Sequence, residues 1–219
     1  MDMDFILQQI PLYREAAGLT LKIAGAGILF STVLGGVFSC IQYFRIPVLK
    51  WMVQGYVELS RNTPLLIQLF FLYFGFPKLG LKWSGETCAV IGLTFLGGSY
   101  MTETFRAGLT QVDRGQKEAG FSLGLTRRQV LFHLIFPQAA AVSMPVYCAN
   151  LIFLIKETSV FSAVAVADLM FVTKDLIGIT YQTDEALFLL VLSYFILLLP
   201  VSLLCRTAER RLRHAGFGD

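Results

Sequence analysis

Residues 103–137, ETFRAGLTQVDRGQKEAGFSLGLTRRQVLFHLIFP, lie between two hydrophobic runs, and this arrangement decides the fold class. The stretch is basic and rich in small residues, and the flanking runs are long enough to cross a bilayer, which takes about 20 mostly apolar residues. The whole chain has 219 residues, of which 55% are hydrophobic and 15% charged. Soluble domains carry roughly 25% charged residues, so the sequence predicts an all-α integral membrane protein.

Further hydrophobic runs extend from this stretch in both directions. The run 134–172 has 39 residues and is interrupted by the polar group KETS at 156–159. As one helix it would be about 58 Å long, nearly twice the roughly 30 Å thickness of the hydrocarbon core. We therefore predict that it crosses once and that 158–172 form a broken helix buried in the bundle, because irregular backbone at membrane depth must lie against protein. The predicted spans, in a single domain of residues 1–219, are 19–42, 53–76, 87–105, 134–157 and 186–204.

The distribution of basic residues predicts the orientation of these five spans. With the N-terminus outside, eleven of the eighteen Lys and Arg fall on the inner side and four on the outer side. This bias satisfies the positive-inside rule, whereas a sixth crossing would place the Arg-rich tail outside. We predict an outer N-terminus and a cytoplasmic C-terminus. The inner residues are Arg45, Lys50, Arg106, Arg114, Lys117, Arg127, Arg128, Arg206, Arg210, Arg211 and Arg213.

Small side chains are concentrated in the cytoplasmic stretch, where a helix is predicted at about 113–128. Ala119, Gly120, Ser122 and Gly124 leave little bulk over two turns, so this helix can enter a groove on a partner, with Glu118 offering a charge. The alternative is an amphipathic helix lying on anionic lipid. The ordered spacing of Glu118, Gly124 and Pro137 favours the docking helix.

These residues carry a resemblance. Glu118-Ala119-Gly120, Gly124 and the run ending at Pro137 resemble the EAA loop of ABC-importer permeases, the coupling helix that grips a separate ATPase. The chain departs from the family pattern at Gly120, where the family has Ala. Where the family has Ile-x-Leu-Pro, this chain has Leu134-Ile135-Phe136-Pro137.

A second motif is ELSRNTPLLIQ at residues 58–68. The apolar part that follows, 64–76, has 13 residues and is too short to span, so the polar group of Glu58, Arg61 and Asn62 must partly enter the protein interior. Glu58 and Arg61 can pair on one helix face, and Pro64 frees a backbone carbonyl. Alternatively, the two charges mark the cytoplasmic boundary and Gln68 makes an interhelical hydrogen bond. The motif resembles a segment of the polar amino acid branch of ABC-importer permeases, with Ser60 and Asn62 in place of Phe and Gly.

A third motif, NLIFLIKETS at residues 150–159, contains ionisable residues next to a predicted span. Such a residue inside a membrane costs about 2.5–3.5 kcal/mol, so its default interpretation is functional. The resemblance implies that Glu157 holds the α-ammonium or a basic side chain of an amino acid, with Thr158 and Ser159 as hydroxyl partners. The alternative places the charges at the outer interface, where Lys156 snorkels. Further candidates for the substrate pathway are Gln68, Ser99, Tyr100, Glu103 and Asn150.

Motifs for intrinsic chemistry are absent from the sequence. No Gly-Lys dipeptide occurs, which excludes a P-loop, and there is no zinc-protease motif, nucleophile elbow or Cys pair at metal spacing. We expect no catalytic residue, no metal site and no cofactor in this chain. The net charge of +3 does not suggest nucleic-acid binding.

The resemblance implies a five-helix type I ABC-importer permease subunit for a polar amino acid, in a bacterial cytoplasmic membrane. It also implies three kinds of partner: two ATPase subunits that use ATP and Mg, a second permease copy or paralogue, and an extracytoplasmic solute-binding protein. One alternative is a proton-coupled secondary transporter that uses Glu58, Glu103 or Glu157. A non-transporting scaffold or sensor is the other.

Overall fold

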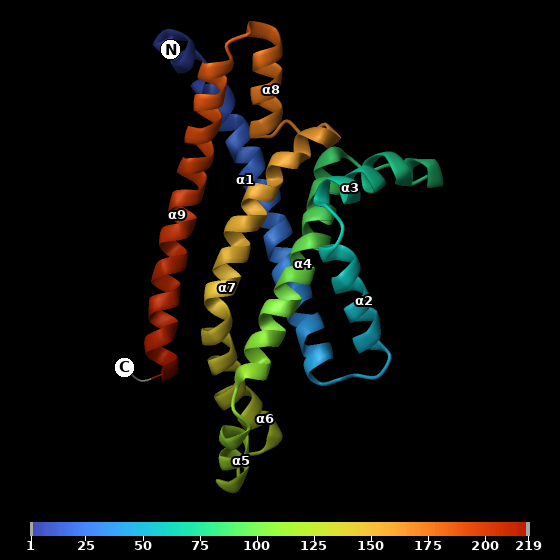
Figure 1. The fold of residues 1–219 in the computed structure, drawn as a ribbon, viewed down its shortest axis with the longest axis vertical. Helices are drawn as coiled ribbons and strands as arrows, with labels where there is room; N and C mark the ends of the chain where they lie inside the picture. The colour runs from blue at the N-terminus through green and yellow to red at the C-terminus, as the bar shows by residue number, and fades with distance from the viewer. Residues whose placement is uncertain (1, 218–219) are drawn as a thin grey trace.

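The computed structural model describes residues 2–217 and the side chains of residues 2–212, and this part of the chain is helical without strands. Residues 1, 218 and 219 of the predicted domain, and the side chain of Arg213, lie outside the described part. Four long helices, α1 (Met3–Tyr43), α4 (Gly85–Gln111), α7 (Phe136–Glu157) and α9 (Thr183–Phe217), run along the long axis (Figure 1). The beginning of α1 and the end of α9 point to opposite ends of the molecule.

Three helical segments of the described chain are long and apolar enough to cross a membrane, namely Met3–Tyr43, Arg127–Val164 and Thr183–Leu212. They contain the predicted spans 19–42, 134–157 and 186–204. The predicted spans 53–76 and 87–105 are not among them. The second of these lies within α4, whose 27 residues make a helix about 40 Å long.

The predicted span 53–76 is not one helix. It is divided between α2 (Leu49–Arg61) and α3 (Leu65–Phe70), and α3 continues as η1 (Phe71–Gly75) and η2 (Phe76–Leu79), which extend sideways from the bundle (Figure 1). The cause is Pro64, which lacks an N–H and disfavours helical backbone at the residue before it. The freed carbonyls are satisfied locally, because Gln68 Nε2 donates to Ser60 O at 3.1 Å and to Thr63 O at 3.0 Å.

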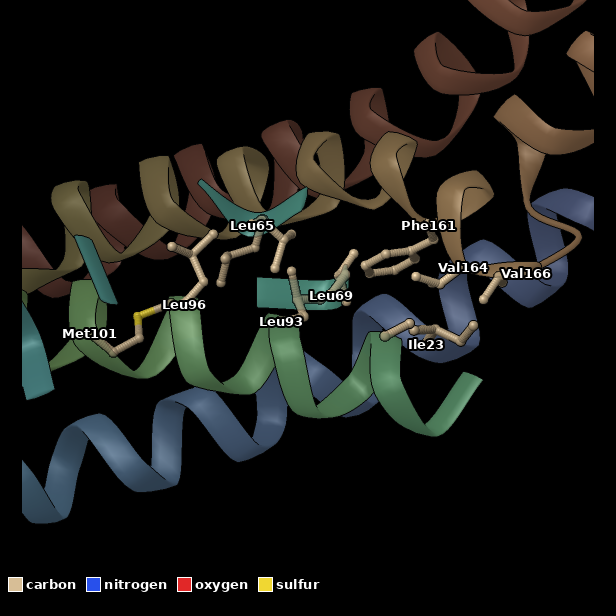
Figure 2. Packing of buried hydrophobic residues seen from close by; sticks show 11 residues of the cluster. Ile23, Leu65, Leu69, Leu93, Leu96, Met101, Phe161, Val164 and Val166 are labelled. Carbon is tan, nitrogen blue, oxygen red and sulfur yellow. The ribbon is translucent and has the colours of Figure 1, made fainter. Parts of the chain in front are cut away.

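The seam between α1 and α4 depends on glycine. A Cβ atom on Gly35 would lie 2.8 Å from the carbonyl carbon of Met101 and 2.9 Å from the amide nitrogen of Thr102, both backbone atoms of α4. Small residues allow such close helix contact inside membranes, where packing rather than water exclusion drives association. The largest buried cluster extends this seam to α3, α7 and η4 (Figure 2), and includes Ile23, Leu69, Leu93, Leu154 and Phe161.

Residues 158–172 leave the axis of α7 and fold back onto the bundle. They form η4 (Thr158–Val164), a turn with Ala165 in the left-handed region at φ 57, and the first residues of α8 (Leu169–Thr180). Asp168 caps α8 by accepting a hydrogen bond from the N–H of Phe171 at 2.9 Å, and its other carboxylate oxygen is buried without a partner in the described chain.

The predicted helix 113–128 is two helices, α5 (Arg114–Ser122) and α6 (Arg127–Gln129), which form the lower tip of the molecule (Figure 1). Helix α5 ends because Gly124 adopts left-handed backbone at φ 78, and Leu125 N–H donates back to Gly120 O at 3.1 Å. Thr126 and Gln129 then form a capping box that starts α6. The π-helical segment η3 (Val130–Ile135) leads into α7.

Candidate functional site

Helix α5 is built onto the rest of the chain through Gly120. A Cβ atom there would lie 2.7 Å from Leu134 Cδ1 and 3.1 Å from Val130 Cγ2, so a bulky side chain at this position would push α5 away from η3. Glu118 and Ala119, by contrast, are exposed. Gly120 is buried and faces η3, so it does not contribute to the exposed surface of α5.

A second contact ties α5 to the end of α1. Lys117 Nζ donates to Tyr43 Oη at 3.0 Å and lies 5.3 Å from the centre of the same ring. A small buried cluster of apolar residues underneath joins α4, η3 and α7. The tip is therefore held by more than one long helix.

The outer surface of the tip carries apolar side chains that sequence reasoning missed. Phe121 is 49% exposed and Leu123 is 82% exposed, three and five residues after the exposed Glu118. Large apolar residues at such exposure suit contact with another protein. Their position in the sequence could have indicated this, because two large apolar residues stand there among small and basic residues, outside every predicted span.

Polar clefts lie among α1, α2, α4 and α7. Three of them adjoin at Arg61, and we name each by one residue. The Arg45 cleft, of about 440 Å³, is also lined by Lys50, Glu58, Glu103 and Arg106. The Asn150 cleft, of about 420 Å³, is also lined by Arg61, Tyr100, Glu103 and Thr104. The Glu157 cleft, of about 350 Å³, is also lined by Arg61, Asn62, Tyr100 and Phe153.

Several residues predicted from separate motifs are thus brought together. Arg61 lies over the ring of Tyr100, with Cζ 5.1 Å from the ring centre, and the rings of Tyr100 and Phe153 are 5.1 Å apart. Asn150 Nδ2 donates to Thr104 Oγ1 at 2.9 Å and so joins α7 to α4. The second and third motifs therefore meet across α4.

The ion pair that the i,i+3 spacing of Glu58 and Arg61 allows is not formed in the described part of the chain. Glu58 instead accepts a hydrogen bond from Gln54 Nε2 at 3.0 Å, and Arg61 has no ion pair within the described chain. Glu103 is occupied as well, because Arg106 donates to its two oxygens at 3.0 and 2.6 Å. The aromatic face of Tyr100 attracts the guanidinium by a cation–π interaction.

Other predicted pathway residues are used inside the fold. Ser99 is buried and donates to Leu96 O at 2.7 Å, and Thr158 is buried and donates to Ile155 O at 2.7 Å. Gln68 is buried at the α2–α3 break. None of these three, nor Ser159, lines the three clefts. Short hydroxyl and amide side chains in helices commonly bond to nearby backbone carbonyls, which explains this outcome.

Comparisons with known proteins agree with this architecture. A family model described as "Binding-protein-dependent transport system inner membrane component" matches residues 20–214. The "Probable amino-acid ABC transporter permease protein PatM" of Vibrio harveyi is 33% identical over 217 residues, which cover 98% of this chain and 97% of that protein. The arginine transport system permease protein ArtQ of Bacillus subtilis is 32% identical over 216 residues, covering 97% of this chain and 99% of that protein.

Solved structures are similar over nearly the full length. A crystal structure described as an amino acid ABC transporter with histidines matches at a TM-score of 0.89 and 29% identity, covering 96% of this chain and 99% of that one. An inward-facing form of the MetNI methionine ABC transporter matches at a TM-score of 0.79 and 20% identity, covering 97% and 99%, and shows the shared fold. Since the family model covers most of the chain, and the relatives nearly all of it, the chain belongs to the binding-protein-dependent transport system inner membrane components, the permease subunits of ABC transporters.

Proposed function

We propose that this permease is the membrane-spanning subunit of an ATP-driven importer that carries a polar amino acid across a bacterial cytoplasmic membrane. In this proposal the chain crosses five times, with α2 and α3 together making one crossing. The N-terminus is outside and the C-terminus is inside. The opposite directions of the two chain ends support an odd number of crossings.

The observation that carries the proposal is the tip formed by α5. It projects beyond the long helices, exposes Glu118, Phe121 and Leu123, and is braced from behind by Gly120 and Lys117. A braced helix with a mixed apolar and acidic outer surface is suited to a groove on a cytoplasmic partner. We assign that partner as the ATPase, because amino-acid ABC transporter permeases match the chain over nearly its whole length.

The remaining partners follow from this assignment. Two ATPase subunits, which bind ATP and Mg, dock on two copies of α5, one from this chain and one from a second permease copy or paralogue. An extracytoplasmic solute-binding protein delivers the amino acid to the outer face. Closure of the ATPase pair on ATP displaces α5 and opens the pathway outward, and hydrolysis returns it to the inward-open state.

Substitution of Glu118 tests the docking assignment. The variant Glu118→Lys reverses a charge on the exposed face of α5 and touches no buried contact, so the chain is expected to insert normally but to lose ATPase during co-purification. Glu15→Lys makes the same change at an exposed site of α1 near the other end and is expected to retain the ATPase. Normal ATPase recovery with Glu118→Lys would refute the assignment.

Substitution of Glu157 tests the substrate pathway. Glu157 lines a cleft of about 350 Å³ that an amino acid side chain can enter. Glu157→Ala is expected to lower uptake and substrate-stimulated ATP hydrolysis in proteoliposomes while the subunits still assemble. Uptake by the wild-type complex that runs on a proton gradient without ATP would overturn the importer proposal itself.

A further inference from the structure

An apolar groove lies between α1, α4 and α7, and we call it the Gly36 groove. Its volume is about 560 Å³, and it shares only Ser143 with the three polar clefts. No charged residue lines it. The residues that form its walls include Gly36 and Ser39 of α1, Phe105 and Leu109 of α4, and Ala140 and Tyr147 of α7.

The hydroxyl groups around the Gly36 groove are already used inside the fold. Those of Thr32, Ser39 and Ser143 donate to backbone carbonyl oxygens at 2.8, 2.8 and 3.3 Å. The rest of the wall is almost entirely hydrocarbon. A groove of this kind favours a hydrocarbon ligand, because a polar ligand would lose its hydrogen bonds to water on entering and gain none.

The length of the Gly36 groove suits one acyl chain. At one end Thr32 Oγ1 and Tyr147 Oη lie 3.2 Å apart and join α1 to α7. At the other end Tyr43 packs on the buried cluster that contains Leu109. From Thr32 to Cys40 the groove runs about 12 Å along α1, close to the depth of about 15 Å of one leaflet of the hydrocarbon core. A transmembrane helix needs the full thickness of about 30 Å and does not fit along it.

A positive charge lies at the end of the groove toward α5. Lys117 Nζ donates to Tyr43 Oη at 3.0 Å and makes no ion pair in the described part of the chain. Because a tyrosine hydroxyl is neutral, it leaves the ammonium charge uncompensated and two of the three N–H donors available. An ammonium group binds a phosphate as a point charge. An apolar groove that ends at such a charge has the layout of a phospholipid, with its hydrocarbon chain next to an anionic headgroup.

We propose that the Gly36 groove binds an acyl chain of an anionic phospholipid whose phosphate pairs with Lys117. In the orientation proposed above, this lipid belongs to the cytoplasmic leaflet. It fills the space between α1 and α7 beside the contacts that hold α5, and so becomes part of the support of the tip. The inference goes beyond the proposed import function and does not depend on which solute is carried.

The experiment uses the full-length permease in phosphatidylcholine vesicles that contain a trace of photoreactive lipid. Two probes carry the same diazirine-bearing acyl chain, one on phosphatidylglycerol and the other on phosphatidylcholine. After illumination, mass spectrometry locates and quantifies the labelled residues. The internal reference is the exposed apolar surface of α9, which lies outside the groove and includes Val191, Phe195 and Leu203.

Two sets of variants test the two halves of the site. Gly36→Phe fills the groove, because no atom lies within 4 Å of a Cβ built there. Gly25→Phe is its matched control, since Gly25 has equally open surroundings on the same helix but does not line the groove. Lys117→Met removes the charge and Lys117→Arg keeps it. Arg114→Met is the control for charge, because Arg114 is exposed on the same helix α5.

In the wild type, the phosphatidylglycerol probe should label the groove about fivefold more than the phosphatidylcholine probe, the factor that one lysine contributes toward anionic lipid. Both probes should label α9 equally. Lys117→Met should abolish the preference in the groove, whereas Lys117→Arg and Arg114→Met should retain it. Gly36→Phe should remove labelling of the groove by both probes, and Gly25→Phe should not.

Three results would overturn the inference. Equal labelling of the groove by both probes in the wild type would mean that it takes bulk lipid without regard to the headgroup. An equal fall with both probes in Lys117→Met would mean that Lys117 only shapes the tip. Absence of labelling by either probe would mean that protein covers the groove, such as a second permease copy. The proposed import function would stand in each case, because it makes no use of the Gly36 groove.

Discussion

Addition of one methyl group at Gly35 should separate α1 from α4. The Cβ atom of an alanine there would lie 2.8 Å from the carbonyl carbon of Met101 and 2.9 Å from the amide nitrogen of Thr102. Both atoms belong to the backbone of α4, so neither can rotate away as a side chain would. The neighbouring Gly36 has no atom within 4 Å of the same position, which makes Gly36→Ala a matched control on the same helix.

The magnitude follows from the difference between the two variants. Overpacking of a close contact costs about 1–3 kcal/mol. The gain of about 1 kcal/mol in helix propensity from Gly to Ala applies to both variants and cancels in the comparison. Gly35→Ala should therefore be about 1–3 kcal/mol less stable than Gly36→Ala. At about 2–4 °C per kcal/mol for a chain of this size, the expected difference in Tm is about 2–12 °C.

The assay is thermal unfolding of both variants, purified in the same detergent and followed by circular dichroism at a fixed scan rate. Wild-type protein is measured alongside, and Gly36→Ala is expected to equal or exceed it. Equal Tm values for Gly35→Ala and Gly36→Ala would refute the argument that backbone contact at Gly35 sets the distance between α1 and α4.

Substitutions at three further positions test other parts of the structure. Gly120→Leu should displace α5 from η3 and reduce ATPase co-purification, whereas Gly120→Ala should be tolerated, because its Cβ meets only side-chain ends, those of Leu134, Val130 and Leu125, which can shift; equal recovery would contradict this. Gln68→Leu leaves the carbonyls at the α2–α3 break without their donor and should cost about 1–3 kcal/mol, measured as a lower Tm; an unchanged Tm would argue against that role. Burial raises the pKa of the Asp168 carboxyl to about 6. Between the ordinary pKa of an Asp and pH 6, the folded chain therefore holds a proton that the unfolded chain has lost. The free energy of unfolding falls as pH rises through this interval. The Tm advantage of wild type over Asp168→Asn should therefore shrink from pH 5 to pH 7, and identical pH profiles would exclude a contribution from Asp168.

The sequence was sufficient for features that depend on composition and on local chemistry. The low charge content predicted an all-helical membrane protein, and the end of the fourth predicted span coincides with the end of α7 at Glu157. The interruption near Pro64 was also foreseeable, since the proline ring forbids a normal helix whatever surrounds it. These signals need no knowledge of neighbouring helices.

Features that depend on which helices meet were not predictable. Helix α1 begins at Met3, well before the predicted span, because its polar first half packs on other helices, with Tyr13 Oη donating to Ala186 O at 3.0 Å. Arg61 lies on Tyr100 rather than beside Glu58 because α4 supplies the aromatic ring. Gly120 belongs to an internal contact for the same reason, since its direction is set by η3 rather than by the motif.

The two attachments of α5 have a mechanical consequence. Lys117 of α5 contacts Tyr43, the last residue of α1, and Gly120 packs on η3, which continues into α7. A force on α5 therefore acts on two long helices of the bundle at once. A displacement of α5 is therefore transmitted to both α1 and α7, because no flexible loop separates α5 from these contacts. On the proposed docking of an ATPase at α5, weakening either contact should leave ATP hydrolysis intact and lower the transport that it drives.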